Sequence, residues 1–313
     1  MEPYAEYSLS PSQSLMPWAN NNYNVYMIRP DDATIKRHVQ YAGNFVSLSV
    51  HDAENLRSAA LSLFAQRHLQ ELHIGGIHPE AMSDKAVVWI RTILKESASL
   101  REISLRSDFI SSKCLQYISR FGQKLTSLEL IEYCKHPELD HLRATDDSIR
   151  RLFCQLPKLE KIKLHLGKLT AASLLSIRTL TELNTLTLDF MSNVNDDLIC
   201  QLLSGDNALP NLSSLSLPGT PITQLALLSI HKKKSITNLD VRFCHIPSNE
   251  FALLKHNNAL KSLDVCFTNA DNTLFDNLPP KLQTLALSHS NVTEDAVQLY
   301  RENHPHVTVK WEN

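Results

Sequence analysis

Glycine is scarce in this sequence, with only seven among 313 residues. Loops that cradle phosphate groups and tight β-hairpins both depend on glycine, so nucleotide-binding sites and compact all-β hairpin folds are disfavoured. Two glycines follow an apolar segment in HIGGIHPEA at 73–81, but they match neither a dinucleotide-binding motif nor a P-loop. A tight turn explains them.

Other features are lacking as well. The six cysteines are scattered without a CxxC pair, and no apolar run approaches the roughly 18 residues that a membrane span needs. The N-terminal stretch MEPYAEYSLSPSQSLMPWANNN has neither the basic start nor the apolar core of a signal peptide. A formal net charge of −2 offers no basic surface for nucleic acid. We therefore expect a cytoplasmic protein with reduced thiols that binds neither nucleic acid nor membranes.

What the sequence does contain is a repeat. Ten segments share or approximate the spacing L-x-x-L-x-L, and their starts lie 22 to 34 residues apart. In each segment the second and third apolar residues alternate with polar ones, as in a strand with one buried face. The connecting stretches carry apolar residues at helical spacing. The clearest strand segments are LEKIKL at 159, LNTLTL at 183, LSSLSL at 212, ITNLDV at 236, LKSLDV at 260 and LQTLAL at 282.

One strand and one helix cannot close a core, but stacked copies can. The pattern therefore predicts an α/β fold, a leucine-rich-repeat solenoid curved as a horseshoe, with parallel strands on the concave side and helices on the convex side. We expect repeats over residues 45–306, an N-terminal cap over 1–44 and a C-terminal capping strand over 307–313. Two longer connections, near 75–90 and 131–147, are expected to form loops on one rim.

The stretch DVRFCHI at 240–246 places a cysteine beside a histidine, which could be a nucleophile and its base. The repeat gives Cys244 another role, because Thr220 and Ser290 occupy the same position, where a side chain turns inward and bonds the turn. His245 then faces away, so the two side chains diverge. We expect no enzymatic activity, no cofactor and no metal. If the chain were an enzyme, its cysteines would be the first candidates.

These units resemble the ribonuclease-inhibitor and cysteine-containing classes of leucine-rich repeats, the latter found in F-box substrate receptors. The stretch DDATIKRHVQYAGNFVSLSV at 31–50 also resembles the helix that enters the first repeat of F-box proteins, although the polar residues before it show no F-box pattern. The resemblance implies a non-catalytic scaffold that binds a protein partner. The alternative is the substrate-recognition subunit of a ubiquitin-ligase complex. Bacterial effectors also use such repeats, which would place the chain in a host cytoplasm.

The repeat also predicts the binding surface. Some charged residues occupy outward strand positions, and three phenylalanines share one column at the strand ends, with Leu166 at its start and Gly219 interrupting it. Aromatic anchors beside charges are typical of binding hot spots. The alternative is that this column is half-buried and the phenylalanines belong to the core. We expect a monomer that binds its partner through the concave face and rim loops, with Phe190, Asp240, Arg242, Phe243, Asp264 and Phe267 as partner-binding residues.

Overall fold

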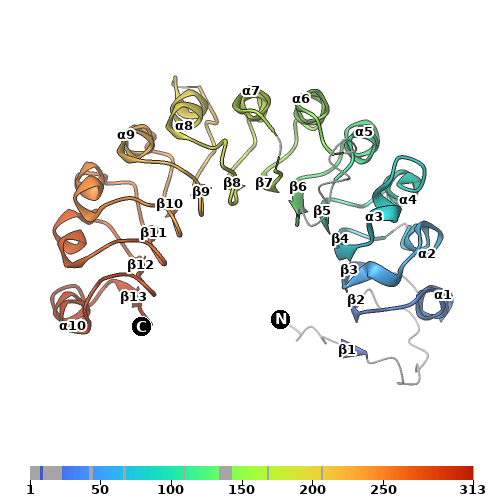
Figure 1. The fold of residues 1–313 in the computed structure, drawn as a ribbon, viewed down its shortest axis with the longest axis horizontal. Helices are drawn as coiled ribbons and strands as arrows, with labels where there is room; N and C mark the ends of the chain where they lie inside the picture. The colour runs from blue at the N-terminus through green and yellow to red at the C-terminus, as the bar shows by residue number, and fades with distance from the viewer. Residues whose placement is uncertain are drawn as a thin grey trace. The chain divides into compact units, whose positions relative to one another are not determined.

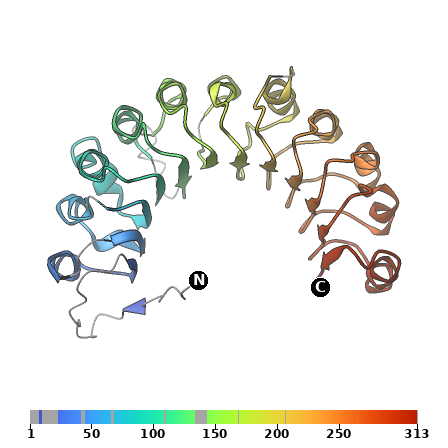
Figure 2. The same ribbon diagram turned by 180° about the vertical axis from the view of Figure 1, so that it is seen from behind.

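The computed structural model describes residues 8–9, 23–41, 45–65, 68–108, 110–133, 143–167, 169–205 and 207–312. The chain divides into two compact units. The first unit comprises residues 1–159 with 166–169, and the second comprises 160–165 with 170–313. In each unit the strands line one face and the helices line the other (Figure 1), which we call the strand face and the helix face. Figure 2 shows the same alternation from behind.

In the first unit, neighbouring strands pair in parallel and in chain order. The strands are β1 (Ser8–Leu9), β2 (Tyr23–Ile28), β3 (Phe45–His51), β4 (Glu71–Ile77), β5 (Glu102–Ser107) and β6 (Ser127–Glu132). The helical elements are α1 (Asp32–Tyr41), the 3-10 turn η1 (Ala53–Asn55), α2 (Ser58–Ser62), α3 (Pro79–Met82), α4 (Val88–Glu96), α5 (Ser112–Phe121) and α6 (Asp146–Gln155).

The second unit repeats this plan with shorter strands, which also pair in parallel and in chain order. The strands are β7 (Lys161–His165), β8 (Thr185–Leu188), β9 (Ser214–Ser216), β10 (Asn238–Asp240), β11 (Ser262–Asp264), β12 (Thr284–Ala286) and β13 (Thr308–Lys310). The helical elements are α7 (Ala171–Leu174), η3 (Leu175–Thr179), α8 (Asp196–Leu203), α9 (Gln224–Lys232), η4 (Ser248–Leu254), η5 (Asn272–Asn277) and α10 (Glu294–Asn303).

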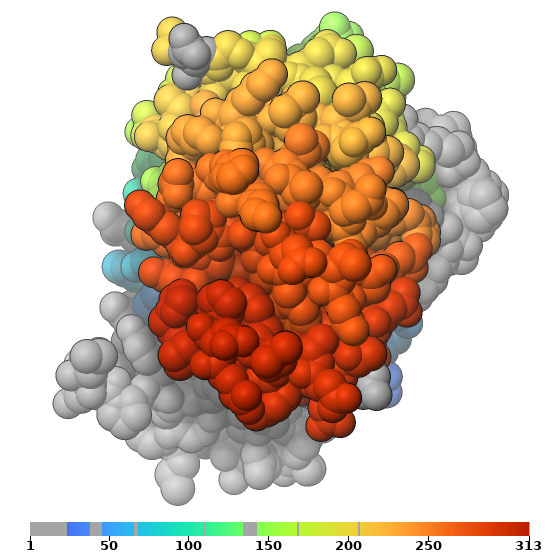
Figure 3. Space-filling model, turned by 90° about the vertical axis from the view of Figure 1, so that its left-hand side faces the viewer, coloured from blue at the N-terminus to red at the C-terminus, as the bar shows by residue number. Residues whose placement is uncertain are grey.

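The register of the strands confirms the repeat that the sequence predicts. Leu239 pairs with Leu215 on one side and with Leu263 on the other, so equivalent repeat positions stand side by side. These leucines are buried, as is Val241, whereas the residues between them face outward. The result is the expected α/β fold of parallel strands alternating with helices, consistent with a leucine-rich-repeat solenoid. On the helix face of the second unit, successive repeats stack directly on one another (Figure 3).

The two predicted terminal caps differ from each other in structure. At the C-terminal end, β13 pairs with β12 and Val307 is buried. Towards the N-terminus, β2 pairs in parallel with β3 and α1 follows, so residues 23–41 add a further strand and helix to the alternation. Most of residues 1–22 lie outside the described residues. None of the described helices is both long and apolar enough to cross a membrane.

The first of the two predicted rim loops is a packed segment. It contains α3, and both Met82 and Trp89 are buried, with the indole N–H of Trp89 donating to the carbonyl of Ala81 at 2.9 Å. This connection therefore adds to the core of the first unit. Residues 134–142 of the second connection lie outside the described residues.

A buried ion pair joins the two described ends of that second connection. Arg143 Nη1 lies 3.0 Å from Glu132 Oε2, and the two residues are only 5% and 2% exposed. Glu132 also accepts hydrogen bonds from the backbone N–H groups of Ile110, at 2.8 Å, and Gly167, at 3.2 Å. One carboxylate therefore connects the end of β6 to three other segments of the first unit. We call Glu132 and Arg143 the anchor pair.

Candidate functional site

A continuous stack of aromatic side chains lies on the strand face of the second unit. Phe190, Phe243 and Phe267 follow the ends of β8, β10 and β11, and are 50%, 38% and 45% exposed. His165 and His289 extend the stack at its two ends. Successive ring centroids, from His165 to His289, lie 6.3, 5.3, 4.5 and 4.4 Å apart. We call these five residues the aromatic ladder.

The backbone of the ladder adopts an uncommon conformation. Phe190, Phe243 and Phe267 have φ angles of 49°, 59° and 57°, and His289 has 55°. A left-handed conformation costs a residue with a Cβ roughly 1–2 kcal/mol, and it is rare for bulky side chains. Hydrogen bonds to the next repeat hold it in place. The N–H of Phe243 donates to the carbonyl of Cys266, and that of Phe267 to the carbonyl of Ser288.

Gly219 explains how the ladder stays continuous across the repeat of β9. Its φ is 61°, and a Cβ built on its backbone would overlap Cδ1 and Cε1 of Phe190. The ring of Phe190 therefore lies over the bare backbone of this glycine. In that position it reaches Phe243, at a centroid distance of 5.3 Å, although a whole repeat separates them. The glycine that interrupts the column in the sequence thus makes room for the stack.

A charged cluster lies beside the ladder on β10 and β11. Arg242 donates from Nε and Nη2 to the two carboxylate oxygens of Asp240, at 3.0 and 2.9 Å, and its Nε is 3.4 Å from Asp264 Oδ2. Ser216 donates to Asp240 at 2.7 Å. The hydrogen bond with Asp240 raises the pKa of Arg242. The guanidinium is thus fixed in a bidentate geometry on the strand face.

The six predicted partner-binding residues all lie in this region. The phenylalanines are exposed, so the alternative that they belong to the core is wrong. The side chains of Asp240 and Asp264 are only 19% and 29% exposed, because they turn towards Arg242. Leu166, expected at the start of the strip, is buried.

The sequence interpretation missed the two histidines of the ladder. His289 stands in the same column as Phe243 and Phe267, so the alignment of the repeats contained a signal for it. His165 stands one position earlier, where the repeat gave no reason to expect a stacking residue. Its ring reaches Phe190 from the end of β7.

Cys244 occupies the structural position that the repeat predicts. It is 1% exposed, and its thiol donates to the carbonyl of Leu217 at 3.1 Å. Thr220 and Ser290 donate to carbonyls three residues earlier in their own repeats, whereas the acceptor of Cys244 lies in the preceding repeat. Burial raises the pKa of Cys244, which disfavours the thiolate, and His245 is exposed.

The described cysteines should therefore differ sharply in reactivity. Burial raises the pKa values of Cys114 and Cys266 to about 12, which leaves thiolate on the order of one part in 10,000 at pH 8. We expect iodoacetamide to modify the exposed Cys154 first, and Cys114, Cys244 and Cys266 only after unfolding. Peptide mass spectrometry of a labelling time course measures this order. Rapid labelling of Cys244 in the folded chain would contradict it and favour a reactive thiol.

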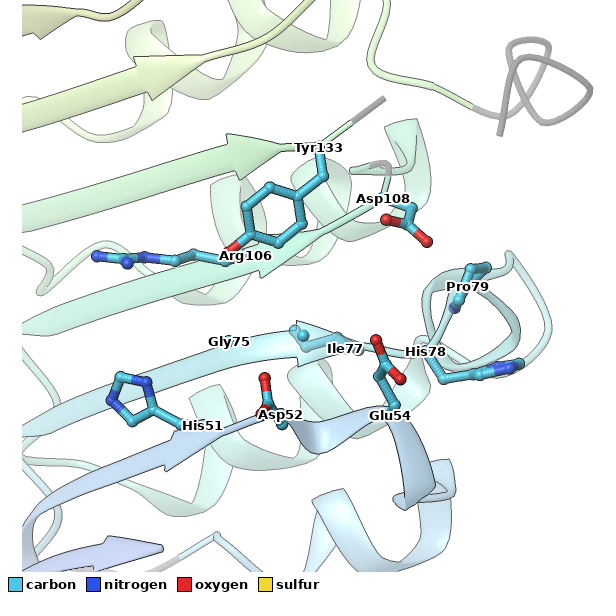
Figure 4. A pocket seen from close by; sticks show the side chains of 11 residues that line it. His51, Asp52, Glu54, Gly75, Ile77, His78, Pro79, Arg106, Asp108 and Tyr133 are labelled. Carbon is cyan, nitrogen blue, oxygen red and sulfur yellow. The ribbon is translucent and has the colours of Figure 1, made fainter. Parts of the chain in front are cut away.

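A hollow lies on the first unit, with a volume of about 720 Å³. Figure 4 shows Asp52 and Glu54 on its β3 side and Arg106, Asp108 and Tyr133 on the opposite side, with Gly75 of β4 between them. Two of its charged groups are already paired within the unit. Asp52 binds Arg29 at 3.0 Å, and Arg106 binds Glu129 at 3.1 Å. Because these groups are already paired, the hollow is a weaker candidate for a ligand-binding site than the aromatic ladder.

The part of the chain that the structure describes contains no group of three or more histidine, cysteine, aspartate or glutamate residues placed to hold a metal ion. Neither the protein-family models nor the curated proteins contain a significant match to this sequence. The aromatic ladder is therefore the feature from which a function can be inferred.

Proposed function

We propose that this chain is a non-catalytic binding module, and that a protein partner binds the strand face of its second unit through the aromatic ladder. The observation that carries this proposal is the row of three phenylalanines, with ring centroids 5.3 and 4.5 Å apart and each residue at least 38% exposed. Exposed aromatic side chains in a fixed arrangement are the usual anchors of protein interfaces, since they bury large areas at low entropic cost.

The size of the ladder supports the role of a hot spot within a larger interface. A phenylalanine side chain offers roughly 200 Å², so the three exposed portions together leave about 270 Å² of apolar surface. A standard interface buries about 800 Å² on each partner. The ladder supplies the apolar centre of such an interface, and the Asp240–Arg242–Asp264 cluster supplies part of a polar rim.

The backbone supports the same proposal independently. Asparagine and glycine adopt a left-handed conformation with less strain than phenylalanine does. Three phenylalanines nevertheless occupy such positions, and they are 38% to 50% exposed. Strain at exposed positions is typical of functional sites, where it serves to hold side chains ready for binding.

The repeat class remains part of the proposal. The inward, hydrogen-bonded Cys244 supports the resemblance to cysteine-containing leucine-rich repeats. Under the alternative, the same surface would recognise substrates of a ubiquitin ligase. Action as a bacterial effector in a host cytoplasm also stays a prediction.

Replacing both Phe243 and Phe267 by asparagine should abolish partner binding without unfolding the chain. Each hot-spot residue contributes about 2 kcal/mol or more, so the double variant should bind roughly 1,000-fold more weakly. Stability should change little, because relief of left-handed strain offsets the lost ring stacking, each worth about 1 kcal/mol. Quantitative affinity purification of the wild-type and variant chains from cells measures the binding, and thermal unfolding measures the stability.

The matched control is Leu299→Gln, which removes a 61% exposed apolar side chain from α10 in the same unit. It should recover the same partner as the wild-type chain. If the Phe243→Asn/Phe267→Asn variant recovers the same proteins in equal amounts, the ladder is not the binding surface. Recovery of a cullin-adaptor subunit with the wild-type chain would favour the ubiquitin-ligase alternative.

A further inference from the structure

The hollow at the ends of β3 to β6 in the first unit shares no residue with the aromatic ladder. We propose that it is a second binding site, which takes a ligand carrying a guanidinium or ammonium group. Its volume of about 720 Å³ falls within the roughly 300–1,000 Å³ of small-molecule sites, and is far more than a single metal ion fills. The floor, the walls and the charges of the hollow each support a cationic ligand of that size.

The floor of the hollow is backbone without side chains. It contains Gly75 and Gly76 of β4. A Cβ added to Gly75 would meet only one heavy atom within 4 Å, the carbonyl oxygen of Val50 at 3.8 Å, so the space above this glycine is open. The backbone of Gly75 is not left-handed, and a residue with a side chain would therefore fit the strand. Glycine at this position keeps the hollow open.

A β-bulge coincides with this floor. The strand β4 pairs regularly with β5 up to Ile74 and again at Ile77, and only Arg106 of β5 lies opposite Gly75 and Gly76. A bulge leaves its extra residue outside the regular backbone ladder, and bulges are common next to functional sites. The irregular part of the sheet thus lies where the chain itself leaves space for a ligand.

The same repeat position forms the hollow in the first unit and the ladder in the second. Asp52 and Gly76 occupy the position of Phe243 and Phe267, and their φ angles of 55° and 67° are also left-handed. Where the second unit fills this level of the repeat with aromatic rings, the first unit has a carboxylate and a bare glycine. The hollow therefore follows from the repeat itself and from the absence of rings at this position.

The walls of the hollow are fixed by packing. On one side stand His78 and Pro79 at the start of α3, a segment anchored by the buried Met82 and Trp89. On another side stands Tyr133, which is 46% exposed. Its ring gives apolar surface for the methylene groups of a lysine or arginine side chain, whose charged end reaches further. Such a site loses little entropy when a ligand binds.

The charges around the hollow are acidic even when every ion pair is included. The charged lining residues and their ion-pair partners are Asp52, Glu54, Asp108, Glu129, Arg29 and Arg106. Four carboxylates and two guanidinium groups give a formal charge of −2. The adjoining segments 80–85 and 134–142 carry four acidic residues and two lysines in their sequences, so they do not cancel it. A cationic ligand compensates this charge.

Two of the carboxylates can act on one ligand. Figure 4 shows Glu54 on one side of the hollow and Asp108 on the other. Glu54 is exposed and makes no ion pair or hydrogen bond with another described residue. A guanidinium group has five N–H donors and an ammonium group has three, so either can bond to more than one carboxylate at once.

Isothermal titration calorimetry on the full-length chain tests the proposal with three probes. The first is a blocked pentapeptide, Gly-Gly-Arg-Gly-Gly. The second has citrulline in place of arginine, which keeps the shape and removes the charge. The third is agmatine, a small molecule with a guanidinium group. Comparison of agmatine with the arginine peptide shows whether the site prefers a small organic cation or a peptide side chain.

Two variants change the hollow and one serves as a matched control. Glu54→Gln removes a carboxylate at constant size, and Gly75→Val fills the hollow from its floor with a residue that suits a strand. The control Asp147→Asn removes an exposed carboxylate of α6 in the same unit, away from the lining residues. Thermal unfolding shows that each variant is folded.

We expect the arginine peptide to bind with a dissociation constant below about 1 mM and at least tenfold more tightly than the citrulline peptide. Gly75→Val should weaken this binding at least tenfold and Glu54→Gln at least threefold. Asp147→Asn and the Phe243→Asn/Phe267→Asn variant should leave it unchanged, which separates this site from the ladder. Equal binding of the two peptides, an equal loss in Glu54→Gln and Asp147→Asn, unchanged binding in folded Gly75→Val, or no binding of either cation at about 1 mM overturns the proposal.

Discussion

The Glu132→Leu variant is expected to unfold with a free energy about 3–5 kcal/mol below that of the wild-type chain. Glu132 is 2% exposed and carries the charge that compensates Arg143. Without it the buried guanidinium of Arg143 loses its carboxylate at 3.0 Å, and removing one partner of a buried ion pair is among the most destabilising of single changes. The backbone N–H groups of Ile110 and Gly167 also lose their acceptor. Urea denaturation followed by circular dichroism measures the loss.

The matched control is Asp147→Asn, which breaks an exposed ion pair on α6. Asp147 lies 2.6 Å from Arg151, and both side chains are more than half exposed. Such pairs contribute about 0–1 kcal/mol, so this variant should stay within about 1 kcal/mol of the wild-type chain. Adding Arg143→Met to Glu132→Leu should recover part of the loss, because the buried guanidinium that had lost the carboxylate of Glu132 is then removed as well. Equal effects of Glu132→Leu and Asp147→Asn would contradict the role of the anchor pair.

The Gly219→Ala variant is expected to lose about 2–5 kcal/mol of stability and to break the aromatic ladder. The left-handed backbone at this position costs alanine about 1–2 kcal/mol. The new methyl group would also overlap the ring of Phe190, and displacing a packed ring adds about 1–3 kcal/mol. Urea denaturation measures the stability. A changed ring environment of Phe190 in the aromatic NMR spectrum reports the break.

Gly205 separates the two contributions. Its φ is 83°, and no heavy atom lies within 4 Å of the Cβ that alanine would add. Gly205→Ala therefore measures the backbone strain alone, and should cost about 1–2 kcal/mol. The stability loss of the double variant Gly219→Ala/Phe190→Ala should be smaller than the sum of the losses of the two single variants. The reason is that the methyl group added at Gly219 overlaps no ring once that of Phe190 is absent. If Gly219→Ala costs no more than Gly205→Ala, the ring does not rest on the glycine.

Only part of the site could be predicted from the sequence. The repeat register placed Phe190, Phe243 and Phe267 in one column, because equivalent positions of stacked units must stand side by side. The register could not decide whether that column was exposed. The exposure of the three phenylalanines depends on the left-handed backbone that follows β8, β10 and β11, which hydrogen bonds to the next repeat hold in place.

Local periodicity determined the fold of this protein. Alternating apolar residues such as Leu239 and Val241 predict a strand whatever lies around them, and the equivalent positions of Thr220 and Cys244 predict an inward side chain. The packed α3 segment, the burial of the anchor pair and the five-ring ladder were decided by the tertiary structure alone. Each joins residues from separate elements, and a contact such as that of Phe190 with Phe243 exists only because Gly219 of an intervening repeat leaves space for it.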